Sequence, residues 1–419
     1  MKTLEELLAM NAEHLEKPLH TLLPYFFVIL WMVTLAIAVC NYRVHHGWNI
    51  GDWLINYHGG FVRRGLTGEI VISLARLTSL NVGIIVVMLQ SLCYGIYFYF
   101  TYLLLRKVYL LPYAMLVVSP FIFTFQINQA FGYRKEIIFF ALLSFLAWSK
   151  CALRRNIFEK IFFIALPFYA LAVLSHEMLI LFIPYLLILY LIGGKPSHKQ
   201  CGSLALCLLP ALVSFLFCLY FKGTHEQVRV IYNTLGNMNY AVPAQGGAIF
   251  SLSISTWDAI CKVRVLFLYL YAAYLPAIAL ALVAFMPIYS TLLALFTDKL
   301  LALLFLLSLV GTVILAIVAE DWGRFIYIHL VSLFILALVA DQSIQNREKP
   351  DRYFGIPMLT VFLVLIWALT FRIPGHGGAG IDGDGVIINK SITEINYLRA
   401  VYYCRRLIHS SAPSFVPSQ

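Results

Sequence analysis

The chain of 419 residues is 61% hydrophobic and only 12% charged, with a formal net charge of +10 and a mean hydropathy of +0.85. This composition excludes a soluble globular domain and indicates an integral membrane protein. The 30 Lys and Arg residues are scattered through short loops, which excludes the single basic face that nucleic-acid binding requires.

Apolar runs of near-membrane length recur from Thr21 to Leu369. A helix needs about 20 residues to cross the hydrocarbon core, and the alternating strands of an outer-membrane barrel are absent. The sequence therefore predicts an all-α polytopic transmembrane helix bundle with about 11 spans, within a range of roughly 10 to 12. The expected spans are 22–40, 82–105, 109–131, 137–149, 161–175, 178–194, 202–221, 265–288, 300–318, 325–340 and 354–371.

The loops between these spans predict the orientation of the chain. Residues 1–20 are amphipathic and acidic, unlike a cleaved signal peptide, so we expect a cytosolic N-terminus. Short basic loops, such as the one with Lys150, Arg154 and Arg155, then fall on the cytosolic side, in keeping with the positive-inside rule. The expected organisation is a membrane domain over 1–371, with outer loops at 41–80 and 222–264, and an outer-side tail over 372–419.

Within the first outer loop, residues 66–79 (LTGEIVISLARLTS) alternate apolar and polar positions at helical spacing. This segment is better suited to lying along the membrane interface than to crossing it. We expect an interfacial amphipathic helix here.

Five polar clusters interrupt the apolar spans, and the predicted topology places all five on the outer side. They are Asp52 with Arg63, Arg64 and Glu69; Tyr133-Arg134-Lys135-Glu136; His176-Glu177; His225, Glu226 and Arg229; and Glu320-Asp321-Trp322-Gly323-Arg324. Hydropathy and loop charge alone place each cluster, without reference to the other clusters. Their shared location on the outer side therefore suggests that they belong together.

Two of these clusters are expected to lie below the outer surface. Glu136 is separated from the cytosolic Lys150 by 13 residues, a helical rise of about 20 Å across a core of about 30 Å. A similar number of residues separates the cytosolic Lys160 from His176, so His176 and Glu177 are also expected to lie inside the membrane. Ionisable groups at such depth face a protein-lined or water-filled cavity. Each pair taken singly could also be a structural lock between helices, but together they favour a functional site.

The residue types at these positions suit transfer from a lipid-linked phosphate. In Gly59-Gly60-Phe61-Val62-Arg63-Arg64, paired glycines precede two arginines whose fork-shaped donors match phosphate oxygens. A carboxylate would act as general base on an acceptor hydroxyl, and Asp52 is the first candidate. The expected catalytic residues are Asp52, Glu136, His176, Glu177 and Asp321; the expected phosphate- or substrate-binding residues are Arg63, Arg64, Arg134, Lys135, Arg324, Tyr57 and His58.

Aromatic residues accompany the charged loops and would suit stacking on sugar rings, although Trp and Tyr also populate membrane interfaces. They are Trp48, Trp53, Tyr57, Tyr133 and Trp322. No cofactor or metal site is expected, and binding of a divalent cation by Glu136, Glu177 or Asp321 is an alternative to a role as base. The expected partners are a lipid-linked sugar donor, a glycan or glycolipid acceptor and membrane lipid, without nucleic acid.

The arrangement of these residues resembles that of the class C membrane glycosyltransferases and the related bacterial polysaccharide polymerases. The resemblance is architectural and covers about the first 200 residues. The resemblance implies a catalytic carboxylate in the first outer loop, which Asp52 matches, followed by an amphipathic helix on the outer leaflet, which 66–79 matches. Many family members carry two adjacent acidic residues there, whereas Asp52 is followed by Trp53. The polymerases hold lipid diphosphate with outer-loop arginines, to which Arg63, Arg64, Arg134 and Arg324 are similar in placement.

The resemblance implies a polyprenyl-phosphate-dependent glycosyltransferase of a bacterial inner (plasma) membrane, active on the periplasmic face in cell-surface polysaccharide or glycolipid assembly. A repeat-unit polymerase for O-antigen or capsule is the first alternative. A transporter or flippase of a lipid-linked or anionic solute is the second, because buried charges also mark translocation paths. A scaffold without chemistry is the third.

Overall fold

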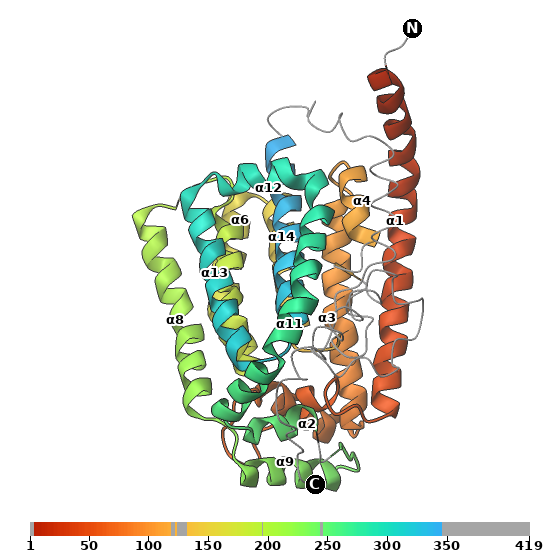
Figure 1. The fold of residues 1–419 in the computed structure, drawn as a ribbon. Coiled ribbons are helices and arrows are strands. Elements are labelled where there is room, and N and C mark those ends of the chain that lie inside the picture. Colours follow the sequence, from red (N-terminus) through yellow and green to blue (C-terminus); the bar gives the residue numbers. More distant parts are fainter. Residues whose placement is uncertain (1–3, 119–121, 124–131, 195, 244–245, 346–419) are drawn as a thin grey trace, which may run out of the picture.

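A computed structural model describes residues 4–118, 122–123, 132–194, 196–243 and 246–345. The described residues are helical and contain no strand, which confirms the predicted all-α fold (Figure 1). The predicted span at 354–371 and the tail at 372–419 lie outside the described residues.

The helices follow the predicted spans closely. In chain order they are α1 (Leu4–Arg43), η1 (Gly51–Leu54), α2 (Leu66–Thr78), α3 (Val82–Leu105), α4 (Leu111–Val118), α5 (Glu136–Ala152), α6 (Arg155–Ser175), η3 (Glu177–Phe182), α7 (Ile183–Leu191), α8 (His198–Tyr220), α9 (His225–Asn237), α10 (Gly247–Phe250), η4 (Ser251–Ser253), α11 (Thr256–Ala284), η5 (Met286–Ile288), α12 (Tyr289–Phe296), α13 (Lys299–Val318) and α14 (Trp322–Gln345). The segment 222–264 is therefore largely helical.

Six helices are long and apolar enough to cross a membrane, and each falls on one of the predicted spans. They are Glu16–Arg43, Val82–Leu105, Arg155–Ser175, His198–Tyr220, Lys299–Val318 and Trp322–Ser343. The remaining predicted spans correspond to shorter helices, to α11, or to residues that the structure does not describe. The total of eleven stays a prediction.

The helices are packed around α14, α5 and α3. Within its apolar stretch 89% of α14 is buried, against 17% for α8 and for α13. α5 packs against both α3 and α14, α3 packs against α1, and α6 packs against α8. Because α8 and α13 leave most of their apolar side chains uncovered, these two helices form the periphery of the bundle.

The N-terminal segment is continuous with the first membrane-length helix. α1 runs through 40 residues, a length of about 60 Å that exceeds the hydrocarbon core of about 30 Å. Its first turns extend away from the end of the bundle that carries α2 and α9 (Figure 1). We call the end with α2 and α9 the site end, and the end where α5 finishes and α6 begins the far end.

At the site end, the segment 41–80 folds as two short helices packed on each other. η1 is wholly buried, and α2 buries Thr67, Gly68 and Val71 on one side while Ile70 and Leu77 are exposed. The helix predicted at 66–79 is present as α2, and its placement on a membrane interface stays a prediction. Gly68 is required where α2 meets η1, because a Cβ there would collide with the carbonyl oxygen of Ile55.

Candidate functional site

The helix η1 holds the carboxylate of Asp52 inside the protein. Its neighbour Trp53 is 1% exposed, and the indole Nε1 donates a hydrogen bond of 2.7 Å to the carbonyl oxygen of Tyr133. Asp52 itself is 1% exposed, and its Oδ1 has no hydrogen-bond partner among the described residues. Since an unpaired buried oxygen is costly, this carboxylate oxygen can accept a hydrogen bond that the described residues do not supply.

A strained turn at Tyr133 directs the next three residues into the site. Tyr133 has a left-handed backbone with φ of +67°, a conformation that costs a bulky residue about 1–3 kcal/mol. Its backbone N–H donates to the Tyr94 hydroxyl, its carbonyl accepts from Trp53 and from Gln90, and its own hydroxyl donates to the Thr34 carbonyl. These four bonds fix the turn against its strain.

The turn buries two cations for which no ion pair is found among the described residues. Arg134 is 7% exposed and Lys135 is fully buried. The Arg134 guanidinium lies 4.7 Å from the Trp48 ring centroid and Nη1 donates to the Trp48 carbonyl at 3.3 Å. The Lys135 ammonium donates to the Arg64 carbonyl at 2.9 Å. An ammonium has three donors, so Lys135 retains capacity for an anion.

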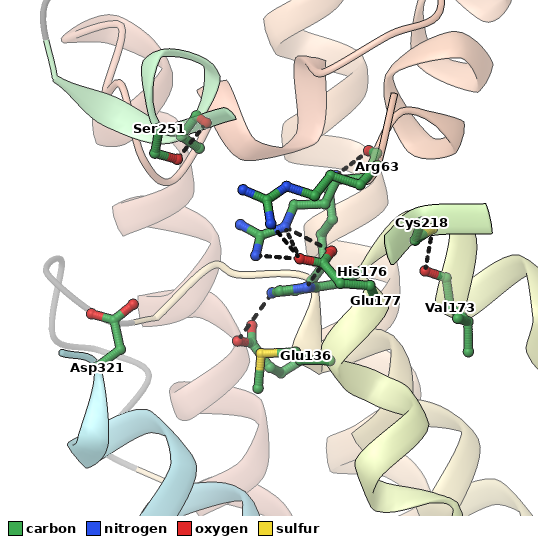
Figure 2. Close-up of polar contacts among 12 residues, drawn as sticks. Arg63, Glu136, Val173, His176, Glu177, Cys218, Ser251 and Asp321 are labelled. Carbon is green, nitrogen blue, oxygen red and sulfur yellow. Dashed lines mark hydrogen bonds and ion pairs between the residues drawn. The ribbon is translucent and has the colours of Figure 1, made fainter. Parts of the chain in front are cut away.

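A second line of charged groups runs from the first loop to α5. Arg64 donates from Nε and Nη2 to the two carboxylate oxygens of Glu177, at 2.8 and 2.7 Å. Arg63 Nη1 is 3.8 Å from the same carboxylate. Figure 2 shows the His176 ring between Glu177 and Glu136, with Nδ1 and Nε2 each 3.6 Å from one of the two carboxylates.

Arg324, at the start of α14, closes this line. Its guanidinium forms an ion pair with Glu136 of α5, and Nη1 lies 2.8 Å from Asp321 Oδ2. The side chain of Met178 lies against the same guanidinium. Asp321 and Arg324 are separated by three positions, a spacing at which opposite charges can pair next to a helix start.

The charges shift the ionisation of the two groups at the centre. Burial alone would raise the pKa of Asp52, but the positive charges of Lys135 and Arg134 outweigh burial and hold that pKa below its ordinary value of 3.8. Burial lowers the pKa of Lys135 to about 8, with Arg64 adding to the effect and Asp52 opposing it. Asp52 is thus ionised at neutral pH, and Lys135 is mostly protonated there.

The site opens to the outside of the protein at a few side chains. Those of Arg63, Arg64 and Asp321 are 26%, 22% and 22% exposed. Behind them, a cavity of about 20 Å³ lies against Arg134, Glu136 and other residues of the turn, which is room for about one water. The exposed side of the site therefore carries two arginines of the first loop and one carboxylate.

The structure brings together ten of the twelve predicted site residues, which we call the charged cluster. They are Asp52, Arg63, Arg64, Arg134, Lys135, Glu136, His176, Glu177, Asp321 and Arg324. Four of the five sequence clusters contribute to it. The fifth lies apart on α9, where Glu226 and Arg229 pair with each other at the surface.

Two predicted binding residues lie away from the charged cluster. The Tyr57 ring stacks on Phe61 at 5.1 Å. His58 contacts the Asn56 side chain and, through Nε2, Arg76 of α2. Tyr57 thus packs within the loop and His58 contacts α2, and their place among the binding residues stays a prediction.

Some residues that build the site were not recognised in the sequence. Trp53 and Tyr133 were expected to stack on sugars, but both rings are buried and hold the turn instead. Gln90 is fully buried in α3 and donates to the carbonyls of Asn49 and Tyr133. An amide in the middle of the apolar span 82–105 was the signal for this role, because such a group must find partners inside the bundle.

No protein-family model, no curated protein and no solved structure matches this chain. Within the described part of the chain, no group of three or more His, Cys, Asp or Glu side chains is arranged to hold a metal ion.

Proposed function

We propose that the protein is a membrane glycosyltransferase that uses a polyprenyl-(di)phosphate-linked sugar at the site end, with Asp52 as the catalytic base. The observation that carries the proposal is the state of that carboxylate. It is buried and ionised among cations, and its Oδ1 has no partner among the described residues. A base must be free to accept the proton of an incoming hydroxyl.

The other carboxylates of the charged cluster are less suited to act as the base. Glu177 is held by three hydrogen bonds from Arg64, and Glu136 is paired with Arg324 through Oε1, while its Oε2 has no partner among the described residues. Asp321 is paired with the same arginine. A carboxylate whose oxygen accepts hydrogen bonds from a guanidinium must give up those bonds to receive a proton there, whereas Asp52 Oδ1 accepts none among the described residues.

The cations that are not consumed by these pairs suit the phosphate of the donor. Arg63 Nε has no hydrogen-bond partner among the described residues, and its side chain lies where the cluster opens. Arg134 and Lys135 have no carboxylate within ion-pair distance among the residues described. Together they offer positive charge where the leaving phosphate gains negative charge, which is how such sites lower a barrier.

In the proposed step, Asp52 accepts the proton of an acceptor hydroxyl. The hydroxyl oxygen forms a bond to the anomeric carbon of the sugar, and the bond from that carbon to the phosphate oxygen breaks. The electron pair leaves with the polyprenyl phosphate, whose charge Arg63 and Lys135 stabilise. A repeat-unit polymerase would use the same step with a longer glycan as donor.

The test compares Asp52→Asn with wild type in a strain or vesicle system that makes the glycan. We expect transfer to fall by a factor of about 100 to 10,000, as for loss of a general base, with the protein still folded in the membrane. Asp298→Asn is the matched control, because it removes one carboxylate at a helix start where Asn caps equally well. Full glycan synthesis by Asp52→Asn would exclude this residue as the base.

The transporter alternative predicts a different result in the same system. A transporter mutant would lose movement of the lipid-linked or anionic solute while transfer in opened vesicles continued. Loss of transfer in opened vesicles, where no barrier has to be crossed, would support chemistry at the charged cluster over translocation.

A further inference from the structure

A second polar cavity lies at the far end of the bundle. It measures about 220 Å³ and is lined by the last turn of α5, the first turn of α6 and the end of α7. A water takes about 30 Å³, so this cavity has room for several waters or a small ligand. The 21 residues of α6, a rise of about 30 Å, separate it from His176 and the charged cluster.

Two cations line this cavity against one carboxylate. Lys150 Nζ donates to the Tyr190 carbonyl at 2.9 Å and lies 5.1 Å from the Phe158 ring centroid. Arg155 Nε donates to Glu159 at 2.9 Å, and no bond from its Nη1 or Nη2 is found among the described residues. The lining therefore carries an excess of one positive charge and unused charged donors.

The Tyr190 side chain supplies an independent observation at this cavity. Tyr190 is 7% exposed, it lines the cavity, and its hydroxyl has no hydrogen-bond partner among the described residues. A buried hydroxyl without a partner costs about 1–3 kcal/mol. Lys150, Arg155 and Tyr190 come from three different helices and all line this cavity, and the Arg155 side chain is 68% exposed.

The backbone leaves this space open beside the arginine. Gly193 has a φ of +82° and Gly194 follows it. A Cβ on Gly194 would lie 3.4 Å from Arg155 Nη1. A side chain at this position would therefore compete with a ligand for the guanidinium.

We propose that the far-end cavity binds a phosphate group, held by Lys150, Arg155 and the Tyr190 hydroxyl. Phosphate fits because it accepts several hydrogen bonds at once and matches the planar fork of arginine. The cavity lies one hydrocarbon thickness from the charged cluster, where basic pockets between helices meet lipid headgroups. The phosphate is that of an anionic phospholipid or a free phosphate ion, and this site is separate from the proposed glycosyl transfer.

The test measures binding to the full chain in phosphatidylcholine nanodiscs, with phosphatidylglycerol added as one probe and inorganic phosphate as the other. We expect the wild-type protein to bind one of the two probes with an affinity about tenfold or more above its affinity for phosphatidylcholine. A preference for phosphatidylglycerol assigns the site to a lipid headgroup, and saturable binding of inorganic phosphate without that preference assigns it to a free ion.

Three variants locate the binding. Tyr190→Phe removes only a hydroxyl that has no partner in the described protein, so it should fold normally and bind about tenfold more weakly. Lys150→Gln with Arg155→Gln should abolish selective binding. Lys160→Gln, which removes an exposed cation near the same helix start, should stay within about twofold of wild type. Equal binding by wild type and Tyr190→Phe, or no binding of either probe by wild type, would overturn the proposal.

Discussion

Arg64 and Glu177, which are 113 residues apart in the sequence, are joined through both carboxylate oxygens at 2.8 and 2.7 Å. The pair connects the loop after η1 to the start of η3, and Arg64 adopts a left-handed backbone with φ of +68° to reach it. The backbone carbonyl of the same arginine accepts the Lys135 ammonium. One residue thus fixes the relative position of three segments that build the charged cluster.

Glu177→Gln should destabilise the protein, because it leaves the partly buried Arg64 guanidinium without its counter-charge. Breaking one partner of a buried pair costs about 3–5 kcal/mol, which should appear as a lower unfolding temperature in detergent. The control is Glu226→Gln, which breaks a pair of the same kind with Arg229 at the surface of α9. Equal unfolding temperatures for the two variants would show that the Arg64–Glu177 pair contributes no more to stability than the surface pair on α9.

The sequence predicted the helices well because their signal is local. A span such as 82–105 is apolar along its whole length, and α3 has these same bounds. The segment 222–264 was expected to be a loop, but it contains α9. This helix buries only one side, formed by Val228, Ile231 and Leu235, and the polar residues on its other side lower the mean hydropathy of the segment. Amphipathic helices outside the apolar core are harder to recognise from hydropathy alone.

The membership of the charged cluster was also largely predictable, but its internal pairing was not. Charged side chains next to apolar spans avoid the hydrocarbon and gather inside the protein. The predicted topology placed these residues on one side of the membrane, and ten of them lie together in the structure. The pairing of Arg64 with Glu177 rather than with a ligand depends on tertiary distances that no spacing encodes. We therefore propose Arg63, Arg134 and Lys135 as the phosphate contacts, rather than Arg64 and Arg324, whose guanidinium groups form closer ion pairs.

Gly68→Ala should separate α2 from η1 and disturb the loop that holds Asp52. The added methyl would collide with the carbonyl oxygen of Ile55, which belongs to rigid backbone, so we expect a loss of about 2–4 kcal/mol in unfolding free energy. Gly236→Ala in α9 is the control, since no atom lies within 4 Å of its added Cβ and Ala favours a helix. If Gly68→Ala is as stable as Gly236→Ala, the close packing of α2 on η1 is not required.

Gln90→Met should weaken the turn that carries Arg134 to Glu136. The substitution keeps the length of the side chain but removes the donor to the Asn49 and Tyr133 carbonyls, at 2.8 and 2.9 Å. We expect a loss of about 1–3 kcal/mol in stability together with weaker binding of a polyprenyl phosphate. Trp53→Phe removes the other side-chain donor to the Tyr133 carbonyl, so the double variant should lose more than the sum of the two single losses. Strict additivity would show that the two donors do not act on one turn.

Binding of a polyprenyl phosphate should weaken as the pH rises through about 8, because the buried Lys135 ammonium loses its proton there. The site then loses one positive charge facing the phosphate, and we expect affinity to fall by about tenfold between pH 7 and pH 9. Lys135→Arg keeps its charge over this range and should flatten the profile. The effect of Lys135 on the free energy of unfolding has the opposite sign. The pKa of Lys135 is about 8 in the folded protein and 10.5 as the ordinary value, so between these pH values the folded state binds fewer protons than the unfolded chain. The free energy of unfolding therefore rises with pH in this window. An affinity that is constant from pH 7 to pH 9 in wild type would remove Lys135 from the phosphate site.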